Sequence, residues 1–197
     1  RVERGAAALP VAPGAPASPV PDAVPVAPRD EWWLLRSGGK VVGTRRLLTL
    51  VTEEEGRRGW RLEERISILP APRLPGVLVQ RIEDTTEDFL PRFLHYRERG
   101  EGDGLRGGSP PYETLRTGPV RDLVWEVTER AGDRSRASHV TLPAQARGPL
   151  GAREFLARAR PRRAGLAELP LIDAGTGAVR VVRAGFVSLG EGGTSRR

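Results

Sequence analysis

The sequence predicts a mainly β fold: a curved antiparallel sheet or half-barrel with one short helix at about residues 150–160. Two observations lead to this prediction. Apolar and polar residues alternate with a period of two in several segments, as they do in strands with one buried face. Turns rich in glycine, proline and aspartate separate these segments, and only one stretch has the 3.6-residue period of a helix.

A hairpin opens the predicted domain. Trp32–Leu35 and Val41–Thr52 have the composition of strands and flank the turn Ser37-Gly38-Gly39-Lys40. Trp32 and Trp33 are adjacent, so in a strand they point to opposite faces and only one can enter the same core. The other packs at the sheet edge or marks a contact surface, whereas we expect Trp60 and Trp125 in the core.

Alternation predicts further strands in the middle of the chain. About eight strands in all must fold over or curl, because an open sheet exposes its edges and a broad apolar face. The predicted segments are Leu62–Ile68 with Leu62, Glu64, Ile66 and Ile68 on one face, Val77–Glu83, Phe93–Arg97, Val120–Glu129 with Leu123, Trp125 and Val127 on one face, and His139–Leu142.

The helix and two closing strands follow. Ala152, Phe155, Leu156 and Ala159 share one helical face, Gly148-Pro149 begins the helix and Pro161 stops it. We expect this helix to cap the concave side of the sheet, and its small apolar stripe leaves room for a cleft beside Phe155. The closing strands are Leu166–Ile172 and Ala178–Leu189, joined by the turn Asp173–Gly177.

The composition divides the chain into three parts. Residues 1–30 form a Pro/Ala-rich tether, residues 31–191 a single β-rich domain and residues 192–197 a flexible tail. The chain begins with Arg1 and contains no methionine, which indicates a processed product or an excised piece of a longer protein. We therefore expect an exported protein, periplasmic or tethered to the membrane on its outer side, with either a lipid anchor or a cleaved signal left open.

The positive charge does not by itself indicate a nucleic-acid partner. The net charge is +7, and every one of the 32 basic residues except Lys40 is an arginine, a bias typical of GC-rich genomes. Acidic residues are interleaved with the arginines, and no recognition helix or aromatic-basic motif is present. We interpret Arg158, Arg160, Arg162 and Arg163 as a solvated helix end.

No catalytic, cofactor or metal site is predicted. His95 and His139 lack a spaced partner, and the acidic cluster of Glu83, Asp84, Glu87 and Asp88 lacks the pattern of a calcium loop. We interpret that cluster as a solvated turn in which Thr85 and Thr86 begin the next strand. Ser135, Ser138 and Ser188 have no nucleophile motif, Gly38-Gly39-Lys40 is a hairpin turn rather than a phosphate loop, and Gly100–Ser109 is a loop.

Three motifs stand out in the predicted domain: an aromatic strand followed by a "vG" strand (Trp32-Trp33-Leu34-Leu35 and Val42-Gly43), a "TTED…P-x-F" run (Thr85–Phe93) and a "GP-x-G…E-x-L" helix entry (Gly148–Gly151 and Glu154-Phe155-Leu156). Together they resemble the region that precedes the catalytic domain in bacterial exported transglutaminase-like proteins of planctomycete type. The resemblance covers about residues 31–191, but the catalytic half of that family uses Cys, His and Asp, and this chain contains no cysteine.

The resemblance implies a noncatalytic accessory domain that positions or regulates an attached domain. The alternative is a curved-sheet carrier, like lipoprotein carriers, that holds a lipid or a hydrophobic peptide. The expected partners are therefore an attached or neighbouring catalytic domain or an apolar ligand, with no specific nucleic acid and no transmembrane segment.

Overall fold

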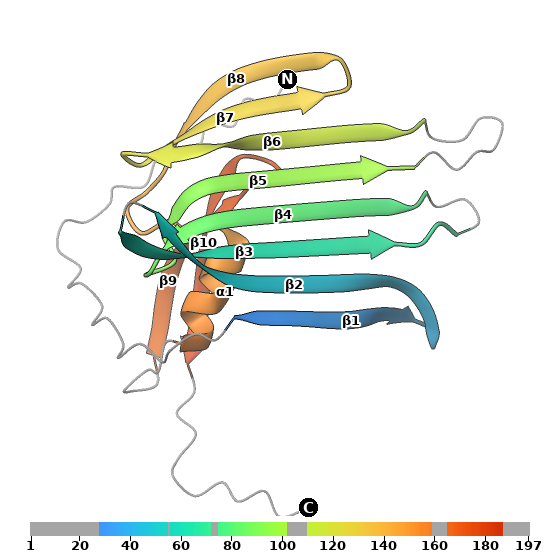
Figure 1. The fold of residues 1–197 in the computed structure, drawn as a ribbon, viewed down its shortest axis with the longest axis horizontal. Helices are drawn as coiled ribbons and strands as arrows, with labels where there is room; N and C mark the ends of the chain where they lie inside the picture. The colour runs from blue at the N-terminus through green and yellow to red at the C-terminus, as the bar shows by residue number, and fades with distance from the viewer. Residues whose placement is uncertain (1–27, 55, 72–74, 102–109, 159–164, 187–197) are drawn as a thin grey trace, which may run out of the picture.

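The computed structural model describes residues 28–54, 56–71, 75–101, 110–158 and 165–186. Eight strands form one antiparallel sheet in which each strand pairs with the next along the chain (Figure 1). β1 and β8 end this order without pairing with each other in the described residues, so the sheet is open rather than a closed barrel. The strands are β1 (Arg29–Ser37), β2 (Lys40–Glu54), β3 (Arg57–Ile68), β4 (Val77–Thr86), β5 (Pro91–Gly100), β6 (Tyr112–Arg121), β7 (Val124–Ala131) and β8 (Arg134–Thr141).

A helix and a separate hairpin cover one face of the sheet near one end of its strands (Figure 1). Helix α1 (Pro149–Arg158) contacts β3 and β4, and β9 (Gly165–Asp173) pairs with β10 (Ala178–Phe186). The amide of Ile172 donates to the carbonyl of Arg147 at 2.9 Å, and the amide of Arg147 donates to Pro170 at 3.0 Å. These bonds join helix and hairpin into one cover. We call the face beneath it the inner face and the opposite one the outer face.

Two hydrophobic clusters fill the space between the inner face and its cover. The larger one joins β5 and β7 to the hairpin, and its members Leu94, Trp125 and Ile172 are fully buried. The smaller one joins β2 and β3 to α1 around Leu150, with the rings of Trp60 and Phe89 stacked at 6.0 Å. The core therefore lies at one end of the sheet, where the cover is.

Left-handed turn residues set the register of the hairpins. Gly38 and Gly39 join β1 to β2 with φ of 55° and 80°, a conformation that glycine adopts without steric cost. Asp122 and Leu123 join β6 to β7 in the same way, with φ of 48° and 62°. Leucine rarely adopts this conformation because its Cβ approaches the following carbonyl. The β6–β7 turn is therefore strained.

The structure confirms the predicted fold class and most elements. The single described helix, the opening hairpin and the closing hairpin lie where they are expected, although β1 begins at Arg29, before the predicted domain boundary. One strand prediction is wrong: Val120–Glu129 is two strands, and Leu123 is a half-exposed turn residue rather than part of an apolar face. The rest of β6, residues 112–119, is not predicted. Most of the tether, the tail and the predicted helix stop at Pro161 lie outside the described residues.

Candidate binding face of the sheet

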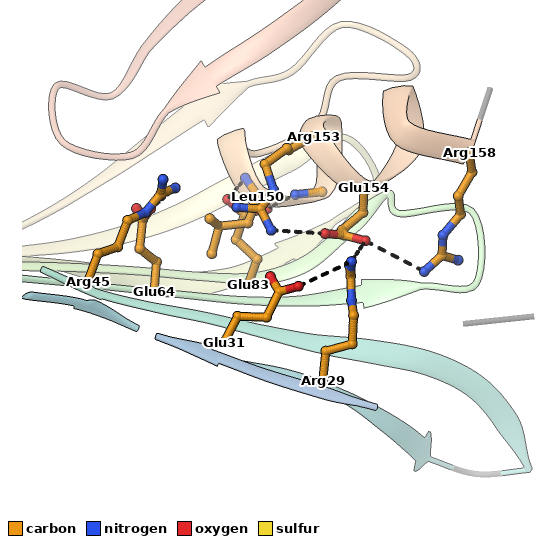
Figure 2. A network of polar contacts seen from close by, with 10 residues as sticks. Arg29, Glu31, Arg45, Glu64, Glu83, Leu150, Arg153, Glu154 and Arg158 are labelled. Carbon is orange, nitrogen blue, oxygen red and sulfur yellow. Dashed lines mark hydrogen bonds and ion pairs between the residues drawn. The ribbon is translucent and has the colours of Figure 1, made fainter. Parts of the chain in front are cut away.

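Glu83 holds the N-terminus of α1 on the sheet. Its side chain is 2% exposed and lies on the inner face between Leu62 of β3 and Leu94 of β5. The amide of Leu150 donates to Oε1 at 2.9 Å and the amide of Gly151 donates to Oε2 at 2.7 Å (Figure 2). The first amides of a helix have no partner within it, so this carboxylate serves as a cap supplied from a distant strand.

The surroundings of Glu83 act on its charge in opposite directions. Burial raises the pKa of Glu83 to about 7, while the hydrogen bonds from the Leu150 and Gly151 amides and the nearby Arg81 lower it. The expected solvated turn is therefore wrong for this residue. Glu87 and Asp88 are exposed, as predicted, but β4 continues through Thr85 and Thr86, which end this strand instead of beginning the next.

Glu154 ties α1 to the N-terminal end of β1. Its side chain is 5% exposed and accepts a hydrogen bond from Nη2 of Arg29 at 2.5 Å and one from Arg153 at 3.1 Å (Figure 2). Nη2 of Arg158 lies 3.8 Å away, and the Arg158 guanidinium stacks on Phe89 at 4.2 Å and on Trp60 at 4.9 Å. The interpretation of Arg158 as solvated is wrong, because its side chain covers the smaller core cluster. Arg160, Arg162 and Arg163 lie outside the described residues.

The surroundings of Phe155 include a cation where an apolar cleft was expected. Phe155 packs against the smaller core cluster, and the guanidinium of Arg147 lies 3.8 Å from its ring centroid. Arg147 is 4% exposed and donates to the carbonyl of Gln145 at 2.9 Å. The space beside this ring therefore holds a cation.

A charged bridge across three strands marks the limit of the covered region. Glu64 on β3 is 2% exposed and accepts a hydrogen bond from Nε of Arg45 on β2 at 2.8 Å, and Nη2 of Arg45 forms an ion pair with the same oxygen at 2.5 Å. Arg81 on β4 binds the second carboxylate oxygen of Glu64. Because an arginine binds the Glu64 carboxylate on each side, these contacts offset the desolvation cost of burying its charge.

Beyond this bridge the inner-face side chains of β3 and β4 are apolar; Val79 packs against the larger core cluster, and the others extend away from it. Ile66 lies opposite Val79 and Ile68 opposite Val77, and all four side chains are half-buried. They continue the alternation of Leu62 and Glu64, so they share the inner face. No element of the described residues lies over this end of the strands (Figure 1). We call Ile66, Ile68, Val77 and Val79 the open patch.

Aromatic and charged side chains border the open patch. On one side, Glu98 accepts hydrogen bonds from Tyr112 at 2.6 Å and from Tyr96, and these bonds lower the pKa of Glu98. On the other side, the guanidinium of Arg45 lies 5.4 Å from the ring of Trp33. Trp33 and Tyr112 are 40% and 42% exposed, so both rings are available to a partner.

A shallow open hollow adjoins this border. It has a volume of about 640 Å³ at the far end of β5, β6 and β7, and its lining includes Arg99, Tyr112, Thr114 and Gly132. The patch and its border form a surface with an apolar centre and a polar rim, an arrangement common in protein interfaces.

The remaining candidate residues do not come together. His95 in β5 is half-buried, and burial together with Arg97 and Arg61 lowers its pKa, whereas His139 in β8 is exposed. In the described part of the chain, no three His, Asp or Glu residues are placed to hold a metal ion. Ser135 and Ser138 lie in β8. Ser188 and most of the loop Gly100–Ser109 lie outside the described residues.

The two tryptophans expected in the core are buried there, and the two at the sheet edge are both exposed. Trp60 and Trp125 are 3% and 0% exposed, so both are core residues as expected. Trp32 and Trp33 point to opposite faces, but neither is buried. The turn Gly38-Gly39-Lys40 is the predicted hairpin turn.

Sequence reasoning missed the residues that define the candidate site. The alternation in residues 62–68 and 77–83 identifies the inner-face positions, but it does not reveal which of them the cover leaves open. Tyr112 lies in the part of β6 that was not predicted. One available signal was a buried-face position occupied by Glu64, because a carboxylate there requires a cationic partner.

Neither family models nor curated proteins nor solved structures give a match to this chain. Among the described residues, α1 has ten residues, and no helix has the length and apolarity needed to cross a membrane. A functional proposal must therefore start from the geometry of the inner face.

Proposed function

We propose that this chain is a noncatalytic accessory domain of an exported bacterial transglutaminase-like protein, and that the open patch and its border contact the attached domain. The supporting observation is the composition of this surface. Four half-buried aliphatic side chains are surrounded by Trp33, Tyr112 and charged groups held by hydrogen bonds. Such a surface fits a folded partner, because its centre is apolar and its rim is polar and preorganised.

The ionisable groups near this surface have structural partners. Glu64, Glu83 and Glu154 are buried, and each is bound by arginine side chains or backbone amides. The chain also contains no cysteine, so a thiolate nucleophile would have to come from another segment or protein. Both observations favour a positioning role over a catalytic one.

Photo-crosslinking from the sheet tests this proposal. A photoreactive phenylalanine analogue at Val77 on the inner face is compared with the same analogue at the next residue, Leu78, on the outer face. Each variant is expressed in the organism from which the chain comes, so that its natural partners are present. We expect Val77, but not Leu78, to crosslink to a segment containing a Cys, His and Asp constellation, in the same polypeptide or a neighbouring one. Equal crosslinking at both positions, or none, would refute the contact.

The carrier function is the second candidate, because the open patch is apolar. A lipid or hydrophobic peptide could lie on its four aliphatic side chains with a polar end near Arg45 or Arg81. Its weakness is the openness of the surface, since small-ligand sites usually enclose most of the ligand. Native mass spectrometry of gently purified protein distinguishes the two: a copurified lipid-sized mass that is lost in Val77→Glu supports the carrier.

A further inference from the structure

The two edges of the sheet differ in their protection against pairing. β8 carries Arg134, Arg136 and several small polar residues, and most of its side chains are exposed. Such charged, polar edges resist the addition of another strand. β1 has the sequence RDEWWLLRS, in which charged residues flank four consecutive apolar residues and neither lysine nor proline is present. In the described residues no second strand pairs with this edge, so its apolar middle can accept one.

Exposed apolar side chains concentrate at the β1 edge. Trp32 and Leu34 are 64% and 59% exposed on the outer face, and Trp33 is 40% exposed on the inner face. Of the eleven large apolar side chains that are exposed in the described residues, six lie in β1 or β2. This edge strand is also held in place, because its Arg29 binds Glu154 of α1, and Arg46 and Arg45 lie over the rings of Trp32 and Trp33.

The charges of β1 are complementary to a second antiparallel copy of the same strand. With Trp33 at the centre of the pairing, Trp32 lies opposite Leu34, and Asp30 of each copy lies opposite Arg36 of the other. Because each contact occurs twice about a two-fold axis, the pairing closes as a dimer. Asp30 already binds Arg46 through both oxygens at 2.8 and 2.7 Å, and a carboxylate has further acceptor sites for Arg36.

We propose that two copies of this chain associate through their β1 edges, in antiparallel register about Trp33, to form one continuous sheet. The backbone groups of each β1 that have no strand partner among the described residues form hydrogen bonds with the β1 of the other copy. The two copies bring together their exposed Trp32 and Leu34 side chains, and two Asp30–Arg36 pairs fix the register. The pairing leaves the open patches of both protomers uncovered, and Trp33, at the border of the patch, takes part both in this dimer and in the surface proposed above.

Substitutions that reverse the charge of Asp30 or of Arg36 test the proposal. The mass of the full chain is followed by sedimentation velocity over a range of concentrations. We expect a dimer for the wild type and a rise of about tenfold or more in the Kd for Asp30→Arg and for Arg36→Asp, because each variant opposes two like charges. An equimolar mixture of these two variants should recover dimers, since every pair in the mixed dimer is again of opposite charge.

Arg130→Asp is the matched control. Arg130 and Arg36 are both exposed, and each donates to a carbonyl of its own hairpin turn, Gly132 at 3.3 Å and Gly39 at 3.2 Å. Arg130 lies on β7, away from the β1 edge, so its reversal should leave the dimer unchanged. A monomeric wild type, a dimer insensitive to Arg36→Asp, or a mixture that stays monomeric would each overturn the proposal.

Discussion

Gly148→Ala should detach the N-terminus of α1 from the sheet. A Cβ at this position would lie well inside 3.0 Å of the carboxyl carbon and both oxygens of Glu83, an approach that real Cβ atoms do not make. The buried carboxylate must then move and weaken its bonds to the amides of Leu150 and Gly151. A hydrogen bond to a charged group contributes about 1.5–3 kcal/mol, so the loss of both would cost about 3–6 kcal/mol.

Because Glu83 can relax partway, we expect the lower end of this range, about 3 kcal/mol. Urea unfolding followed by tryptophan fluorescence measures the change, since Trp60 and Trp125 are buried in the folded state. Hydrogen exchange should show faster exchange at the Leu150 and Gly151 amides. Gly76→Ala is the control, because its Cβ would meet no atom closer than 3.3 Å. Equal stability of the two variants would refute this account of the cap.

Three further predictions concern charge and strain. Because the pKa of Glu83 is raised from 4.5 to about 7, the folded state keeps a proton that the unfolded chain releases between these values. This group should therefore lower the free energy of unfolding by on the order of 3 kcal/mol as the pH rises from about 4.5 to 7, and urea titrations should show a flatter dependence in Glu83→Gln. Glu64→Ala leaves Arg45 and Arg81 without their shared carboxylate and should cost about 2–4 kcal/mol, whereas Glu113→Ala, which breaks the exposed pair with Arg97, should cost less than about 1 kcal/mol in the same assay. Leu123→Gly should raise the free energy of unfolding by about 1 kcal/mol because glycine relieves the φ of 62°, and an equal gain from Leu123→Ala would contradict this explanation.

The sequence predicted the β-rich fold because the period-two pattern and the glycine turns are local signals. It failed at Asp122-Leu123, where the pairing of Arg121 with Val124 places leucine in a left-handed turn that no local preference indicates. Without that turn, the strands on either side of it read as one. The fold class therefore follows from local chemistry, while one strand boundary depends on the surrounding sheet.

The role of Glu83 was hidden for a different reason. In sequence it belongs to an acidic cluster that is typical of a solvated turn, and its hydrogen-bond donors are 67 and 68 residues away. Arg158 was misread in the same way, since an arginine at a helix end is usually solvated. Its burial depends on the rings of Trp60 and Phe89, which the fold brings beneath it. Neither contact can be inferred from the spacing of residues along the chain.

These buried charges explain how a helix with a small apolar stripe stays on the sheet. α1 has ten residues, and two carboxylates anchor it: Glu83 from β4 binds its N-terminus, and its own Glu154, in the middle of the helix, binds Arg29 of β1. Polar anchors depend strongly on direction, so they position the helix more exactly than apolar contacts alone. The cover therefore ends at a defined line, the Glu64 bridge, and the aliphatic side chains beyond it stay open. The charged anchors and the open patch are thus two consequences of one arrangement: a cover that is too small for its sheet.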